Sequence, residues 1–175
     1  VYEALSHAGI ATRSKVEVDM IEAEDIESGK TSLENADGVL IPGGFGNRGV
    51  QGKLTAIRYA REHGLPILGI CLGMQGMVIE YARNVLGWSD ADSTEFAAKT
   101  THPVIDLMAD QRKTTAKGGT MRLGAYPCHL VPGSTAERAY GTNRISERHR
   151  HRFEFNNLYR EEFERAGLSI SGTSP

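Results

Sequence analysis

Hydrophobic positions in the first half of the chain follow two different periods. Four of them recur at helical spacing: Val50, Leu54, Ile57 and Ala60. Gly64 follows as a helix stop signal, so we predict a helix that ends there. Short apolar runs at residues 38–41 and 66–70 flank this helix and predict strands, and a second helix is expected from residue 72 to about residue 84.

The other segments have weaker patterns. Residues 1–8 predict a helix that ends at Gly9. The remaining patterns predict, in chain order, a strand at 15–21, a charged loop, an irregular stretch at 97–117 with an exposed excursion at 110–115, a strand pair or long bent strand at 119–131, a strand at 148–155, a helix at 158–166 ending at Gly167, and a short strand at 169–172.

These elements together predict an α/β fold. Strand, helix, strand and helix joined by short connections are typical of a mostly parallel, doubly wound sheet with helices on both faces, and the second half adds a few antiparallel strands. We find no internal repeat and no linker, so we expect one domain over residues 1–175. Ligands bind such sheets beyond the carboxyl ends of the strands, where the loops after residues 41 and 70 should meet.

Composition excludes several classes of function. The formal net charge is −2 and the pI about 6.3, so neither nucleic acid nor a membrane surface is an expected partner. No apolar run approaches the roughly 18 residues that span a membrane. The two cysteines, Cys71 and Cys128, form no CxxC pair. We expect reduced thiols, a cytoplasmic protein and no metal site.

Cys71 lies at a junction that is typical of a catalytic nucleophile. An apolar strand precedes it, a helix follows it, and Gly69 and Gly73 stand two residues to either side. Glycines at these positions let strand and helix approach closely around a strained turn, and the helix N-terminus favours a thiolate. The alternative is a small core residue. The glycines favour the nucleophile for Cys71, whereas Cys128 has no such frame and is expected in the core.

A thiolate that attacks a carbonyl produces an oxyanion, which needs hydrogen-bond donors. The backbone N–H of Leu72 is placed for this by the turn, and Gly44, in the loop after the first strand, is the expected second donor. Taken alone, this loop could be a simple tight turn. Residues 44–49 also match a loose G-x-G-x-x-G pattern, but a clear acidic ribose partner is missing, so we reject dinucleotide binding.

The basic run at residues 148–152 alternates arginine and histidine. In a strand its arginines share one face and its histidines, His149 and His151, the other. The run alone leaves open a solvated face, a nucleic-acid patch or a site in which arginines bind a carboxylate.

Several motifs together identify a family resemblance. The run Gly69-Ile70-Cys71-Leu72-Gly73-Met74-Gln75 resembles class I (triad-type) glutamine amidotransferases, which implies a flavodoxin-like fold. Four more segments are similar to the glutaminase domain of the CTP synthase family: Pro42-Gly43-Gly44-Phe45-Gly46, Asn35-Ala36-Asp37-Gly38, Gly118-Gly119-Thr120-Met121-Arg122-Leu123-Gly124 and Glu147-Arg148-His149-Arg150-His151-Arg152.

The resemblance implies a role for each site residue. Cys71 would attack the side-chain amide of L-glutamine, forming a thioester and releasing ammonia, and the oxyanion would be held by Gly44 and Leu72. Glu95 would bind the α-ammonium group of glutamine and Arg152 its α-carboxylate. The rest of the glutamine pocket is expected to comprise Gly73, Met74 and Gln75.

The resemblance also implies partners. In the family, a separate synthetase domain uses the ammonia, with ATP and Mg²⁺, to convert UTP to CTP, and the enzyme is a homo-oligomer (a tetramer). No cofactor is expected in the glutaminase domain itself. GTP activates the family's glutaminase, and residues 46–52 resemble a loop linked to that response.

One expected feature is missing from the 175 residues. The family's general base lies in a His-Pro-Glu segment, and no histidine follows His151. We therefore expect a partial glutaminase domain, truncated at both ends, without the synthetase domain and with little activity of its own. The competing interpretations are a noncatalytic glutamine-binding or assembly module and an unrelated cysteine hydrolase.

Overall fold

The computed structural model describes residues 1–44, 46–107 and 122–175, which form two compact units, Val1–Met77 and Val78–Pro175. The elements of the first unit are α1 (Tyr2–Thr12), α2 (Ala23–Glu27), β1 (Val39–Ile41), α3 (Val50–His63), β2 (Ile67–Gly69) and the first part of α4 (Leu72–Asn84). Those of the second are the rest of α4, β3 (Asp92–Ser93), β4 (Pro103–Leu107), β5 (Arg122–Leu130), α5 (Thr135–Tyr140), β6 (Arg144–His151), β7 (Phe153–Phe155), the 3-10 helix η2 (Asn157–Tyr159), α6 (Arg160–Arg165) and β8 (Gly172–Thr173).

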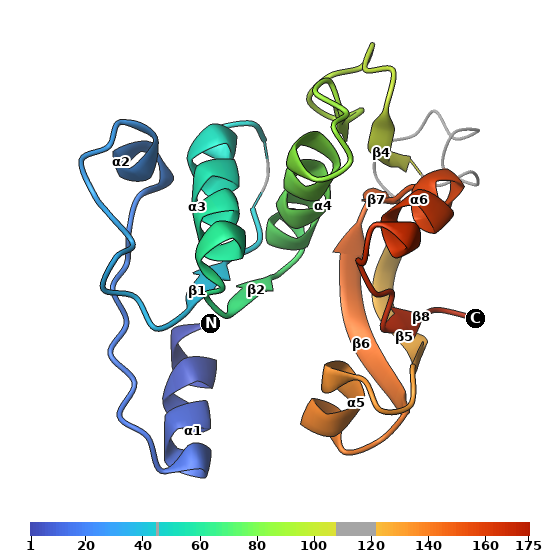
Figure 1. Ribbon diagram of the computed structural model, residues 1–175. Coiled ribbons are helices and arrows are strands. Elements are labelled where there is room, and N and C mark those ends of the chain that lie inside the picture. The colour runs from blue at the N-terminus through green and yellow to red at the C-terminus, as the bar shows by residue number, and fades with distance from the viewer. Residues whose placement is uncertain (45, 108–121) are drawn as a thin grey trace. The chain divides into compact units, whose positions relative to one another are not determined.

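The first unit is built around a parallel strand pair. β1 and β2 pair in register from Val39 opposite Ile67 to Ile41 opposite Gly69, and α3 connects them (Figure 1). The apolar stripe of α3 contributes Ala56 and Ile57 to a core that also contains Ile41. The predicted strand–helix–strand–helix order is therefore confirmed, and both β strands end at the same edge of the pair.

The second unit contains two three-stranded sheets. One has the order β3-β4-β7, with β3 parallel and β7 antiparallel to β4. The other has the antiparallel order β6-β5-β8 (Figure 1). Phe163 of α6 is fully buried, and its ring lies within 5.4–6.2 Å of the ring centroids of Phe155, Tyr81 and Trp88. The fully buried aliphatic residues Ile79, Val104 and Ile105 also belong to the core of the second unit.

Two predictions for the N-terminal segment are wrong. The first helix continues past Gly9 to Thr12 and ends with Arg13 in a left-handed conformation. Gly9 is needed for a close approach instead, because a Cβ there would lie 2.8 Å from the Ser14 carbonyl oxygen. Residues 15–21 alternate like a strand but pair with no described strand, and the charged loop after them contains α2.

Three predictions for the second half need correction. The basic strand is interrupted at Arg152, where the chain bends between β6 and β7 and enters a different sheet. The segment expected at 158–166 is a 3-10 helix followed by the short α6. The stretch at 97–117, which was expected to be irregular, contains β4. Several predicted features lie outside the described residues: Phe45, the excursion at 110–115, residues 118–121 of the quoted motif, and the start of the strand predicted at 119–131.

No helix in the described ranges is long and apolar enough to cross a membrane.

Candidate functional site

Cys71 has a strained backbone conformation at the point where β2 passes into α4. Its φ is 56°, in the left-handed region that residues with a Cβ rarely adopt. Ile70 is held just before the turn, since its N–H donates to the Ile41 carbonyl oxygen at 2.9 Å. The thiol is partly exposed. This is the geometry of a nucleophile presented on a sharp turn.

The glycines on either side of Cys71 are required by packing. A Cβ on Gly69 would lie 2.6 Å from the carbonyl carbon of Gly73. One on Gly73 would lie only 2.1 Å from the carbonyl oxygen of Ile41 in the neighbouring strand. These distances are shorter than any real Cβ contact, so α4 begins where it does only because both positions lack a side chain.

The glycine loop after β1 lies against the nucleophile. A Cβ on Gly43 would stand 3.2 Å from Cβ and 3.8 Å from Sγ of Cys71, and one on Gly44 would stand 3.5 Å from Leu72 Cδ2. The prediction that this loop and Cys71 share one edge of the sheet is confirmed. Leu72 is the first residue of α4, and the first N–H groups of a helix have no partner within the helix. The start of α4 and the glycine loop after β1 therefore both lie close to Cys71.

Lys53 of α3 is a residue of this region that the sequence patterns did not indicate. Its Nζ would lie 3.6 Å from a Cβ on Gly44, so a positive charge stands beside the glycine loop. A cation there stabilises negative charge that develops nearby. The signal that could have found it is the helical spacing of Lys53 from Gly49, since α3 starts directly after the loop.

The other expected pocket residues of the first unit lie in the first turn of α4. Gln75 is 5% exposed, and its N–H donates to the Cys71 carbonyl oxygen at 3.0 Å. Met74 is 38% exposed, although it is apolar. Gly73 N–H donates to Ile70 O at 2.9 Å and closes the turn. The helix thus presents one buried polar and one exposed apolar side chain directly after the nucleophile.

Glu95 and Arg152 come together in the second unit. Glu95 follows β3 in a tight turn, where its N–H donates to the hydroxyl of the fully buried Ser93 at 3.2 Å. Burial raises the pKa of the Glu95 carboxyl, and the positive charge of Arg152 partly offsets that rise. The Arg152 guanidinium carbon also stands 5.9 Å from the centroid of the Phe153 ring. One acidic and one basic side chain are therefore close enough to interact, although 57 positions separate them.

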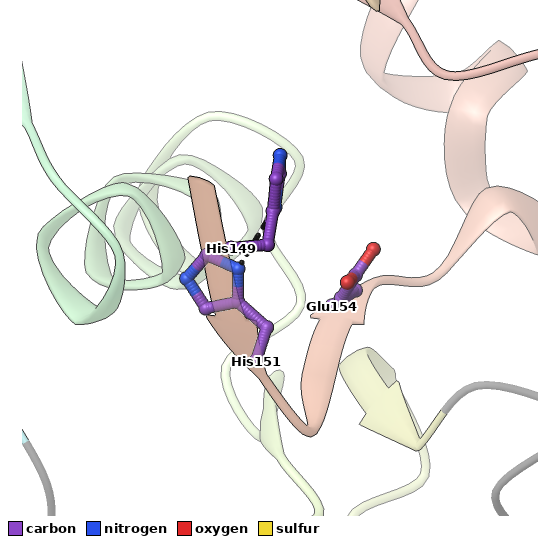
Figure 2. Close-up of side chains that lie close together, drawn as sticks. All are labelled: His149, His151 and Glu154. Atoms are coloured by element: carbon purple, nitrogen blue, oxygen red, sulfur yellow. Dashed lines mark hydrogen bonds between the residues drawn. The ribbon is translucent and has the colours of Figure 1, made fainter. Parts of the chain in front are cut away.

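The histidines of the basic run lie on one face of β6, as predicted. His149 and His151 are partly buried, while Arg148 and Arg150 are exposed. The two imidazoles lie with their Nδ1 atoms 3.2 Å apart, and Glu154 of β7 lies beside them (Figure 2). Burial lowers the pKa of both imidazoles. Glu154 was not singled out from the sequence, because the bend at Arg152 is what places it there.

Cys128 differs from Cys71 in its setting. It lies within β5, opposite Ile145 of β6, and a Cβ on Gly172 would approach its sulfur to 2.9 Å. Tyr126 and Leu130, not glycines, stand two residues to either side of it, and β5 continues past it to Leu130. Cys128 is partly exposed and not fully buried in the core as the sequence predicts, but its strand setting is that of a packing residue.

Comparison with known proteins identifies the family. The family Glutamine amidotransferase class-I matches residues 1–175, which is the whole chain. The chain belongs to the class-I glutamine amidotransferase family. Within this family it is similar to the glutaminase domain of CTP synthases, as its sequence motifs predict.

Three relatives illustrate this similarity. CTP synthases of Fibrobacter succinogenes and Chloroflexus aurantiacus are 63% and 58% identical to it, and the matches cover all of this chain but only 31% and 32% of those proteins. A solved structure described as "Trypanosoma brucei CTPS - glutaminase domain with bound acivicin" has a TM-score of 0.90 at 38% identity, over 99% of this chain and 68% of that one. The chain thus spans about a third of the length of these CTP synthases, and the α/β fold is confirmed.

Proposed function

We propose that the chain is the glutamine-hydrolysing part of a CTP synthase and that Cys71 is its nucleophile. The observation that carries this proposal is the left-handed backbone of Cys71, between two glycines that packing requires and against the Gly43–Gly44 loop. No structural use for a thiol explains such a turn, whereas nucleophilic catalysis needs an exposed sulfur with backbone donors around it.

The proposed reaction has two steps. The Cys71 thiolate attacks the side-chain amide carbon of glutamine, and the N–H groups of Leu72 and Gly44 stabilise the oxyanion that forms. The C–N bond breaks, ammonia leaves with a proton from a general acid, and a thioester remains. Water then attacks the thioester, which releases glutamate and the thiol. In the family the general acid and base is a histidine of a His-Pro-Glu segment, and the 175 residues contain no histidine after His151.

Substrate recognition is proposed to rest on two charges. Glutamine carries an α-ammonium and an α-carboxylate group, and Glu95 and Arg152 offer one charge for each. Gly73, Met74 and Gln75, in the first turn of α4, are proposed as further glutamine-binding residues. The electrostatic interaction between Glu95 and Arg152 supports their assignment to one binding site.

The fate of the ammonia is proposed from the relatives. Since the chain spans about a third of their length, the remainder is proposed to be the synthetase domain, which is expected to use ATP and Mg²⁺ to aminate UTP and to form a tetramer. GTP activation through residues 46–52 belongs to the same proposal. In that segment Arg48 hydrogen-bonds to Glu24 at 2.7 Å, which lowers the pKa of the Glu24 carboxyl. The two free thiols favour a cytoplasmic location.

Labelling with a thiol-alkylating glutamine analogue tests the nucleophile. Acivicin is the first compound to use, because it is bound to the Trypanosoma brucei glutaminase domain. We expect mass spectrometry to find the label on Cys71 and not on Cys128, with protection by glutamine. Cys71→Ser abolishes the labelling and the matched Cys128→Ser leaves it unchanged. Equal labelling of both thiols, or none, supports a noncatalytic module or another class of hydrolase instead.

Two further variants test the pocket. Glu95→Gln and Arg152→Met each remove a charge that glutamine recognition needs, so the glutamine concentration that protects Cys71 should rise about tenfold or more. Arg148→Met is the matched control, because Arg148 is exposed in the same basic run. If all three variants are protected alike, Glu95 and Arg152 do not bind glutamine.

A further inference from the structure

The second unit contains a group of possible metal ligands that takes no part in the proposed glutaminase site. One ligand atom from each of His149, His151 and Glu154 lies within 4.8 Å of the other two (Figure 2). The two histidines stand on the same face of β6, two positions apart, and Glu154 approaches them from β7 after the chain bends. All three side chains are partly buried.

The distance between the two imidazoles suits one small metal ion. Two histidine nitrogens that bind zinc at about 2.0–2.1 Å in a tetrahedral site lie about 3.3 Å apart. The observed distance between the Nδ1 atoms of His149 and His151 is 3.2 Å. Two basic nitrogens at this distance share either a hydrogen or a cation, and β6 already holds them at the spacing a metal needs.

The carboxylate supplies a second, independent observation. Oε2 of Glu154 accepts a hydrogen bond from Nη1 of Arg122 at 2.9 Å. Its other oxygen, Oε1, is buried and has no hydrogen-bond partner among the described residues, and the same is true of Nε of Arg122. A buried carboxylate oxygen without a partner is costly, and a bound cation would remove that cost. Arg122 then orients the carboxylate, as outer hydrogen-bond partners of metal ligands commonly do.

We propose that His149, His151 and Glu154 form a binding site for a borderline divalent transition metal of the Zn²⁺ or Co²⁺ type. Two nitrogen ligands and one oxygen ligand suit such ions, and water would complete the coordination. The Arg122 guanidinium beside the single carboxylate disfavours Mg²⁺ and Ca²⁺, which depend on several charged oxygens. This proposal is independent of the glutaminase function.

Cobalt titration of the untagged chain tests the site. Both thiols are first replaced, as Cys71→Ser and Cys128→Ser, so that sulfur cannot bind the metal. We expect one Co²⁺ per chain, visible absorption bands of a four- or five-coordinate ion, and loss of these bands when Zn²⁺ is added. Mg²⁺ should not remove them. A titration without visible bands overturns the proposal.

Variants identify the ligands. His149→Asn, His151→Asn and Glu154→Gln should each weaken Co²⁺ binding by more than about tenfold, since loss of an outer hydrogen-bond partner alone costs that much. His129→Asn is the matched control, because His129 is an exposed histidine of the adjacent β5. Equal binding in the control and the three variants overturns the proposal, as does equal weakening in all four.

A measurement on the chain with its histidines intact covers the case in which a variant fails to fold. Diethylpyrocarbonate modifies accessible imidazoles, and mass spectrometry locates the adducts. Zn²⁺ should protect His149 and His151 and leave His129 and His7 reactive. Protection that is uniform, or absent at His149 and His151, contradicts the assignment.

Discussion

Gly73 shows how one residue without a side chain controls the position of the nucleophile. Its Cα lies so close to β1 that a methyl group would stand 2.1 Å from the Ile41 carbonyl oxygen. The oxygen belongs to backbone that pairs with β2, so it cannot move without disturbing the strand pair. The same contact therefore sets both the start of α4 and the strained φ of Cys71.

Gly73→Ala is expected to destabilise the chain by about 3 kcal/mol, because the added methyl group must push α4 away from β1. Labelling of Cys71 by a glutamine analogue should be lost at temperatures where the variant is still folded. Urea unfolding gives the change in stability. Gly38→Ala is the control, since its Cβ would meet the Pro66 oxygen at an ordinary 3.4 Å and should cost only about 0.5 kcal/mol. Equal costs at both positions would contradict the packing argument.

Asp90 gives a residue-scale prediction for pH dependence. Hydrogen bonds from the Thr101 hydroxyl and backbone N–H and from His102 hold the pKa of its carboxyl well below the ordinary 3.8. The unfolded chain therefore takes up this proton at higher pH than the folded protein does. The stabilisation is present above pH 3.8 and declines as the pH falls below it.

Asp90→Asn should accordingly lower the melting temperature at pH 7, and its difference from the parent should shrink progressively below pH 3.8. Thermal melts followed by circular dichroism across this range measure the effect. Asp19→Asn changes the same charge at an exposed position and should follow the parent curve throughout. A difference between Asp90→Asn and parent that does not depend on pH would refute the linkage.

At the scale of elements, the junction between α4 and β3 determines where Glu95 lies. Arg83, in the last turn of α4, donates to the Ala91 carbonyl oxygen at 2.7 Å and to Asp92 Oδ2 at 2.8 Å. Both side chains of the Arg83–Asp92 ion pair are largely buried, at 26% and 19% exposed. β3 begins at Asp92, and the turn that carries Glu95 follows it directly.

Arg83→Ala is expected to cost about 2 kcal/mol of stability, since it leaves a partly buried carboxylate and a carbonyl oxygen without their donor. If the turn after β3 carries a pocket residue, the variant also requires more glutamine to protect Cys71. Chemical denaturation and the labelling assay measure the two effects. Arg165→Ala is the matched control, because its ion pair with Glu161 is exposed and should contribute almost nothing. Comparable losses in both variants would mean that burial does not decide the effect.

The elements that sequence patterns predict well are those with local causes. α3 and α4 have apolar stripes, and Gly64 ends α3 in a left-handed conformation, so their boundaries are confirmed. Alternation at residues 15–21 misled the prediction because a strand also needs a partner, which no local pattern reveals. The bend at Arg152 depends on how β6 and β7 join two sheets, and it was missed for the same reason.

The same difference between local and long-range causes decides which residues of the candidate site can be predicted from the sequence. The turn at Cys71 is predictable because glycine spacing, strand and helix all lie within a short stretch of chain. Glu95 and Arg152 approach each other only through the fold of the second unit, so nothing short of a family resemblance singled them out. Glu154 joins His149 and His151 through a bend, and sequence patterns gave no sign of it.

At the scale of the whole molecule, the expected activity depends on which parts of a CTP synthase the 175 residues contain. The chain spans about a third of the CTP synthases it resembles and has no histidine after His151. The proton transfers of glutamine hydrolysis therefore lack an assigned residue within the described chain.

The 175-residue chain should consequently still form the Cys71 adduct with a glutamine analogue. Its release of ammonia from glutamine should be slower than that of an intact domain by several orders of magnitude, because the members of a catalytic triad act as a unit. A coupled ammonia assay, run beside the labelling experiment on one preparation, separates binding from turnover. The control is the glutaminase domain of a similar CTP synthase that includes its His-Pro-Glu segment. Turnover equal to that control would show that a histidine among the 175 residues serves as the base, and His149→Asn and His151→Asn would then identify which one.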